Sequence, residues 1–185
     1  MKFLILFFLM AFSLNAAEVT NFNAATSNGL TYELFSHSKA KAIVVIAHST
    51  SCPIVRQTSP RLEEIIKQYK KKNVEFIYLN SNLQDDLKSI NKEVKEYNIS
   101  IPVIMDKDQK IIKNFGLKVT AETIIINPAT WSIVYKGAID DQINYASKKS
   151  KAIKNYLADA LDDVLAGKEI RVKSSRPFGC SISIN

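Results

Sequence analysis

The chain has 185 residues, of which 46% are hydrophobic and 23% charged, and this is enough apolar sequence for one domain with a buried core. The formal net charge is +7, but basic and acidic residues alternate in stretches such as 92–96, which is typical of a solvated helix face and argues against a nucleic-acid partner. None of the five glycines lies in a phosphate-cradling or dinucleotide pattern, so we expect no nucleotide chemistry and no cofactor.

Residues 1–17 are predicted to be a secretory signal peptide. Lys2 precedes an apolar run from Phe3 to Leu14, and the small residues Ala16 and Ala17 provide a cleavage site. The run is short for a helix that spans a bilayer, and no later segment is apolar enough to do so. We therefore expect an exported protein with no stable membrane span after cleavage, with an uncleaved N-terminal anchor as the alternative.

The next part of the chain alternates strands and helices. Thr31–Phe35 is a short strand candidate, and the continuous apolar run Ala42–Ala47 is typical of a strand buried on both faces of a sheet. After Cys52, Pro53 suits the first position of a helix, and Pro60 is expected to kink that helix. The apolar residues of this helix recur at helical spacing, at Leu62, Ile65, Ile66 and Tyr69.

The second half of the chain continues this alternation. Four more strands are expected, at Val74–Leu79, Val103–Met105, Thr123–Ile126 and Ile133–Lys136, and the last two pair across a turn at 127–129. Three more helices are expected, one begun by Asp85–Asp86, one over Lys110–Phe115, and one from Lys149 to Ala166 with its apolar side inward from Ile153 onward. This order predicts one α/β domain over 18–167, followed by a tail over 168–185 that carries Cys180.

Cys52 is the residue most suited to chemistry. It lies between a buried strand and a helix, so its sulfur should sit at the helix N-terminus, where the amides of Ile54 and Val55 and the helix dipole favour a thiolate. A thiolate is the attacking species in disulfide exchange and in peroxide reduction. The alternative is a structural half-cystine or an inert buried thiol.

Three further titratable side chains, those of His48, Asp140 and Asp141, could take part in chemistry or serve only the structure. His48 at the end of the preceding strand could share a proton with the thiol, or form a soft copper site with Cys52, Cys180 and Met105. A lone histidine at a strand end more often makes an ordinary hydrogen bond. The adjacent acids Asp140 and Asp141 are expected to form a solvated turn or a cap, without a catalytic role.

Several ordered motifs resemble those of the exported redoxins in the alkyl hydroperoxide reductase/thiol-specific antioxidant superfamily. They are VVIAHSTSCPIVR at 44–56 with Pro60 beyond it, IMDKD at 104–108, VYKGAIDD at 134–141, and RPFGCSI at 176–182. The resemblance covers about residues 31–182. It implies a thioredoxin-like fold with a central mixed β-sheet flanked by helices, a bacterial periplasm, and protein thiols or disulfides, or a small peroxide, as partners.

The chain departs from the patterns of such proteins at two positions beside the thiol. Dithiol thioredoxins carry a second cysteine three residues after the first, and here that position is Val55. Thioredoxin-like proteins also place a cis-proline before the strand that here is Thr123–Ile126, and the matching residue is Ala121. A cis bond before alanine costs about 3 kcal/mol, so we expect a trans or rearranged loop.

The usual peroxide-positioning residues also differ. Peroxiredoxins set a threonine three residues before the cysteine and an arginine on a later strand. Here Ser49 stands at that position with Thr50 after it, and Arg56 could approach only from the first helical turn. Peroxide reduction therefore ranks second among the predicted activities.

Three functional hypotheses remain. The first is a thiol–disulfide oxidoreductase in which Cys52 is the nucleophile and Cys180, in a tail outside the packed elements, is the resolving thiol. A permanent Cys52–Cys180 bridge that only pins the tail is its structural alternative. The second hypothesis is a two-cysteine peroxidase, and the third is a non-enzymatic copper- or protein-binding module that uses Cys52 and His48. The sequence does not predict the oligomeric state.

Overall fold

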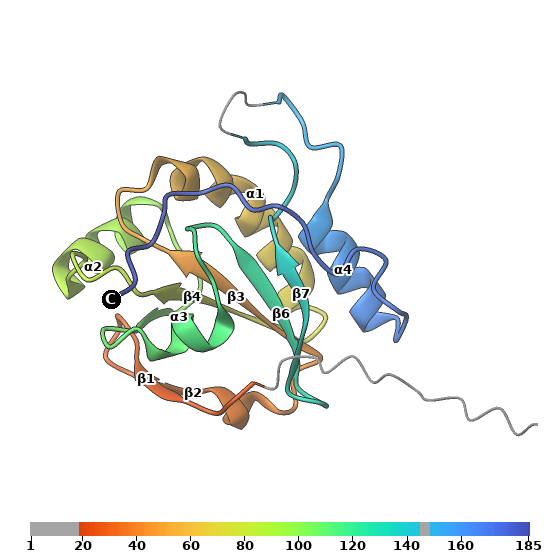
Figure 1. Ribbon diagram of the computed structural model, residues 1–185, viewed down its shortest axis with the longest axis horizontal. Coiled ribbons are helices and arrows are strands. Elements are labelled where there is room, and N and C mark those ends of the chain that lie inside the picture. The colour runs from red at the N-terminus through yellow and green to blue at the C-terminus, as the bar shows by residue number, and fades with distance from the viewer. Residues whose placement is uncertain (1–18, 145–148) are drawn as a thin grey trace, which may run out of the picture.

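The computed structural model describes residues 19–144 and 149–185, which form a mixed five-stranded sheet flanked by helices (Figure 1). The predicted signal peptide at 1–17 lies outside the described residues. In chain order the elements are β1 (Asn23–Ala25), β2 (Thr31–Glu33), the 3₁₀ helix η1 (Leu34–His37), β3 (Ala42–His48), α1 (Pro53–Lys70), β4 (Val74–Asn80), α2 (Leu87–Glu96), β5 (Val103–Met105), α3 (Lys110–Phe115), β6 (Thr123–Asn127), β7 (Ser132–Gly137) and α4 (Tyr156–Leu165).

The main sheet has the strand order β5-β4-β3-β6-β7. β3 pairs in parallel with β4 and β4 in parallel with β5, whereas β6 runs antiparallel to both β3 and β7. A second, two-stranded sheet pairs β1 with β2. The mixed α/β architecture predicted from the sequence is therefore confirmed, and its central strand is the one that leads into Cys52.

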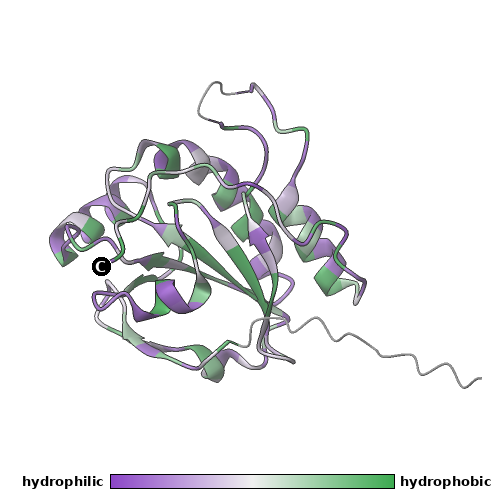
Figure 2. Cartoon of the chain, viewed as in Figure 1, coloured by the Kyte–Doolittle hydropathy of each residue, from purple (hydrophilic) through white to green (hydrophobic). Residues whose placement is uncertain are grey.

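The core lies on both faces of the main sheet. Val44 and Ile46 of β3 pack into the cluster that α1 and α4 cover, while Ile43 and Val45 pack into the cluster beneath α3 and β2. All seven residues of β3 are buried, as expected for a strand without polar alternation. Figure 2 shows this concentration of hydrophobic residues along the central strands.

The last helix begins later than the sequence predicts. α4 starts at Tyr156 instead of Lys149, and Ile153, predicted to face inward, is 77% exposed. The carboxylate of Asp141 accepts hydrogen bonds from the amides of Ile153 and the next residue and pairs with Lys149, which holds 149–154 in a non-helical path. Asp141 thus binds the segment before α4, whose N-cap residue is Asn155, and its neighbour Asp140 is buried, not solvated.

The tail after α4 is bonded to the domain along much of its length, contrary to the expectation that it lies outside the packed elements. Ser174 forms a bridge with Lys136 of β7, and Ser181 forms one with Val119 in the loop before β6. Beyond it, the side chain of Gln109 binds the backbone at 183 and 185. In Figure 1 the dark-blue tail crosses from the α4 side towards the α3 side. Within residues 19–144 and 149–185, no helix is long and apolar enough to cross a membrane.

Candidate active site

Cys52 lies at the junction of β3 and α1, where the sequence predicts it. It is the N-cap residue of α1, with an extended backbone, and Pro53 follows at the first helical position. Ser51 before it has a positive φ of 63°, which turns the chain out of the strand. The cysteine side chain is therefore directed at the first turn of α1, where the backbone amides have no helical partner.

The sulfur of Cys52 lies between two partners from distant parts of the chain. Its Sγ is 2.7 Å from Sγ of Cys180 and 3.0 Å from Oγ1 of Thr120, and both cysteines are free thiols in this structure. Cys52 is only 4% exposed and packs with Val55 and Ala121, whereas Cys180 is half-buried. The two cysteines that the sequence pairs are brought together.

The surroundings give the two thiols different acidities. Burial raises the pKa of Cys52, but hydrogen bonds from Cys180, from Thr120 and from the Val55 amide outweigh it, so the pKa lies below the ordinary value. The pKa of Cys180 is raised, by burial and by the Cys52 sulfur, although the Ile54 amide works against this. Cys52 is therefore the more acidic of the two thiols and Cys180 the less acidic.

Thr120 is a site residue that sequence reasoning missed. Its hydroxyl contacts the Cys52 sulfur and also accepts a hydrogen bond from the Cys180 amide at 2.9 Å. Ala121, which the sequence singles out, follows a trans peptide and has a positive φ of 59°, with its amide bonded to the carbonyl of Ala47. The loop is thus trans, as expected. The one sequence feature that could have pointed to Thr120 as a site residue is its place directly before Ala121.

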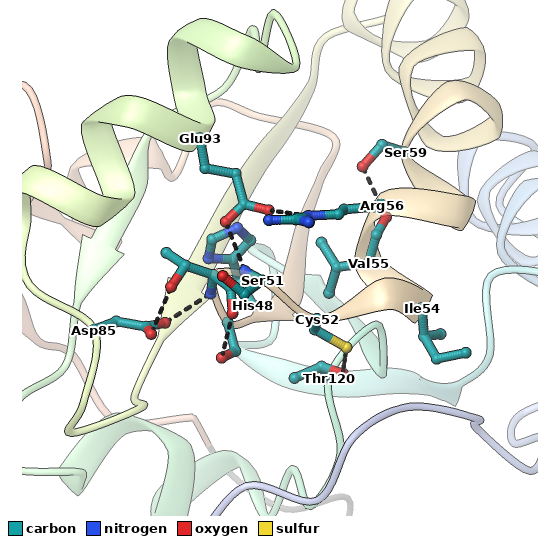
Figure 3. Close-up of polar contacts among 12 residues, drawn as sticks. His48, Ser51, Cys52, Ile54, Val55, Arg56, Ser59, Asp85, Glu93 and Thr120 are labelled. Carbon is teal, nitrogen blue, oxygen red and sulfur yellow. Dashed lines mark hydrogen bonds and ion pairs between the residues drawn. The ribbon is translucent and has the colours of Figure 1, made fainter.

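The polar side chains that stand near the peroxide-positioning places in the sequence are engaged elsewhere. The hydroxyl of Thr50 donates to the buried carboxylate of Asp85 at 2.6 Å, and that of Ser49 accepts from Asn82 at 2.9 Å. The guanidinium of Arg56 turns towards α2, where it pairs with Glu93 at 3.4 Å (Figure 3).

Two buried carboxylates hold the loop before Cys52. Asp85 accepts from the amide of Thr50 at 2.7 Å, and Glu93 accepts from the amide of Ser51 at 3.1 Å (Figure 3). Both acids are about nineteen-twentieths buried, and burial raises the pKa of Glu93 despite these hydrogen bonds. The polar residues next to Cys52 therefore position the backbone of the site.

Comparison with known proteins identifies the family. The family model described as AhpC/TSA matches residues 16–142, which is more than half of the chain. The chain belongs to the AhpC/TSA family. The matched range of this AhpC/TSA protein contains Cys52 and Thr120 but ends before Cys180, so the second thiol belongs to a part of the chain that the family model does not cover.

Individual relatives agree with this assignment. The protein is 28% identical over 110 residues to the thiol-disulfide oxidoreductase ResA of Halalkalibacterium halodurans, a match that spans 60% of this chain and 61% of the relative. Among solved structures, a hypothetical protein from Sinorhizobium meliloti 1021 superposes with a TM-score of 0.79 at 24% identity, over 94% of this chain and 96% of that one. The thioredoxin domain of a Bacteroides vulgatus thiol-disulfide oxidoreductase gives 0.57 at 16% identity, over 67% and 89%. The fold is thioredoxin-like.

His48 lies buried beneath the site of this AhpC/TSA protein. Its Nδ1 is 3.2 Å from the side-chain amide of Asn80 and its ring packs against Tyr78, while its Nε2 has no hydrogen-bond partner among the described residues. Burial lowers the pKa of His48 to about 4, so the ring is neutral near pH 7. In the described part of the chain, no three histidine, cysteine or acidic side chains gather into a group that could hold a metal ion.

Acidification is expected to destabilise the protein through His48. Because the ring takes up a proton at about pH 6.5 when unfolded and at about 4 when folded, stability is fully present above 6.5 and falls as the pH drops towards 4. The loss should reach about 3 kcal/mol. Urea unfolding at neutral pH and near pH 4 measures it. The variant His48→Phe, which cannot titrate, should lose correspondingly less; equal losses in both proteins would refute this assignment.

Removing the Thr120 hydroxyl is expected to raise the pKa of Cys52. In a Cys180→Ser background Cys52 is the one remaining thiol, and its ionisation can be followed by the ultraviolet absorbance of the thiolate. Adding Thr120→Val should move that titration to higher pH, because the hydroxyl stabilises the anion. Thr58→Val is the matched control, since the Thr58 hydroxyl bonds to carbonyls of α1. An unchanged titration in Thr120→Val would contradict the geometry.

Proposed function

We propose that this protein is an exported thiol–disulfide oxidoreductase in which Cys52 is the nucleophile and Cys180 the resolving thiol. The observation that carries the proposal is the 2.7 Å separation of the two sulfurs at a helix start, where hydrogen bonds lower the pKa of Cys52. Similarity to a protein named thiol-disulfide oxidoreductase ResA supports the activity, and the signal-peptide pattern at 1–17 supports export.

The proposed cycle is two thiol–disulfide exchanges. The Cys52 thiolate attacks one sulfur of a partner's disulfide, so a mixed disulfide forms and the partner's other sulfur leaves as a thiolate. Cys180, having lost its proton to that departing thiolate, then attacks Sγ of Cys52 and releases the partner's remaining thiolate. The partner's disulfide is thereby reduced to one thiol and one thiolate, the latter taking its proton from water, and Cys52 and Cys180 become a disulfide. A dithiol reductant closes the cycle by the reverse exchange.

Peroxide reduction and copper binding have less support. Ser49, Thr50 and Arg56 bond to Asn82, Asp85 and Glu93 instead of approaching the sulfur. His48 is bonded to Asn80, and the side chains that contact the Cys52 sulfur are those of Thr120 and Cys180. We therefore advance disulfide exchange with a protein partner as the function.

A trapping experiment tests the proposal. The Cys180→Ser variant cannot complete the second exchange, so incubation with insulin, a disulfide-bonded protein, should accumulate a mixed disulfide at Cys52 that mass spectrometry detects. Ser181→Ala, which changes the exposed neighbouring side chain, should turn over without accumulating the adduct. If the Cys180→Ser protein forms no adduct, Cys52 does not have the proposed role.

A further inference from the structure

The C-terminal tail pairs with the loop beside Cys52 as a short antiparallel strand. The amide of Thr120 donates to the carbonyl of Cys180 at 2.9 Å, and the amide of Ile182 donates to the carbonyl of Lys118 at 3.0 Å. Between them, Val119 and Ser181 form an antiparallel bridge. The backbone at 118–120 is therefore a strand edge that binds an extended, cysteine-bearing segment and sets its sulfur against Cys52.

The residue before the cysteine in this segment has to be glycine. Gly179 is buried, and a Cβ built on it would overlap the carbonyl oxygen of Thr120 and crowd the Thr120 hydroxyl. The overlap is with backbone, which cannot rotate away as a flexible side chain would. The edge at 118–120 thus accepts a glycine–cysteine pair and excludes larger residues at the position before the cysteine.

With the tail in place, a protein partner has little access to the nucleophile. Cys52 is 4% exposed, and Cys180 packs against it. The tail is also anchored away from the sulfur, because Ile182 packs into the core cluster that includes α3 and Gln109 binds the backbone at 183. A partner segment can reach Cys52 only when the tail leaves the edge at 118–120.

We propose that residues 179–182 are a built-in competitor of the substrate at the backbone edge 118–120, and that this edge selects a substrate segment with glycine directly before its reactive cysteine. This inference rests on the proposed function. Departure of the tail admits the substrate strand, Cys52 forms the mixed disulfide, and return of the tail brings Cys180 to Cys52 while displacing the product strand. The electrons and leaving groups are those of the two exchanges above.

The test uses the full chain with Cys180→Ser, so that Cys52 is the reacting thiol. The probes are two peptides, one with the sequence of residues 176–185 and one with alanine in place of its glycine, each carrying thionitrobenzoate on the cysteine. Attack of Cys52 on the peptide sulfur releases coloured thionitrobenzoate. Gly179→Ala and, independently, Ile182→Ala are added to unseat the tail. Ile184→Ala is the matched control, because the Ile184 side chain is 41% exposed and lies outside residues 179–182.

We expect both unseating variants to react about tenfold or more faster with the glycine peptide than the parent protein, and Ile184→Ala to match the parent. In the two unseating variants, the rate with the glycine peptide should exceed the rate with the alanine peptide by a similar factor. Equal rates for the two peptides, or no acceleration in either variant, would overturn the inference. The proposed function would still stand in that case if insulin were trapped at Cys52. Failure of Cys52 to react with both peptides and with insulin would overturn both.

Discussion

Replacing Cys52 with serine is expected to abolish disulfide reduction, lowering the rate by about three orders of magnitude or more to that of the uncatalysed reaction. A serine hydroxyl does not ionise near neutral pH and forms no mixed disulfide, so neither exchange step can occur. The hydrogen bonds from Thr120 and the Val55 amide that stabilise the sulfur anion would then have no reacting group to act on.

The measurement is insulin reduction with dithiothreitol as the terminal reductant, for the purified chain and its variants. Thr58→Val serves as the control on the same helix, because its hydroxyl bonds to the carbonyls of Ile54 and Val55 and not to the reacting sulfur. That variant should retain most of the activity. Activity in Cys52→Ser close to that of the unaltered protein would place the chemistry elsewhere.

Oxidation of the cysteine pair is expected to stabilise the fold by about 4–5 kcal/mol, since a Cys52–Cys180 bond closes a loop of about 128 residues and restricts the unfolded chain. Urea unfolding of the oxidised and the reduced protein, monitored by circular dichroism, measures the difference. The Cys180→Ser protein is the control and should unfold identically with and without oxidant. Coincident unfolding curves for the oxidised and reduced unaltered protein would show that the pair contributes no such constraint.

The parts of the structure that depend on local patterns could be predicted. The helix start at Cys52 follows from the apolar run of β3 before it and from the proline that opens α1. The start of α2 is likewise decided within a few residues, by the Asp86 cap. The pairing of Cys52 with Cys180 was also accessible, because two cysteines in an exported chain have few alternatives.

Contacts between distant segments could not be predicted. Thr120 is 68 residues from Cys52, and its role depends on how the loop before β6 meets the start of α1. The late start of α4 depends on Asp141, whose carboxylate takes the amides that a longer helix would have used. In both cases tertiary hydrogen bonds override what the local sequence favours.

The residues around Cys52 show why a motif alone misleads. Ser49, Thr50 and Arg56 occupy places near the thiol in the sequence and invite comparison with peroxide-binding positions. In the fold, the buried acids Asp85 and Glu93 on the segment after β4 bind the loop and the arginine instead. Because their partners are Asp85 and Glu93, the polar residues near Cys52 hold the loop in place.

The central claim is that Cys52 and Cys180 form a reversible redox pair, and a redox titration with mass mapping tests it most directly. The folded protein is equilibrated in buffers of graded oxidised to reduced dithiothreitol, quenched with acid, alkylated and digested. The account predicts one two-electron transition in which a single Cys52–Cys180 linkage opens while the protein stays folded. A linkage that opens only after unfolding, or two thiols that stay unlinked under oxidising conditions, would contradict it.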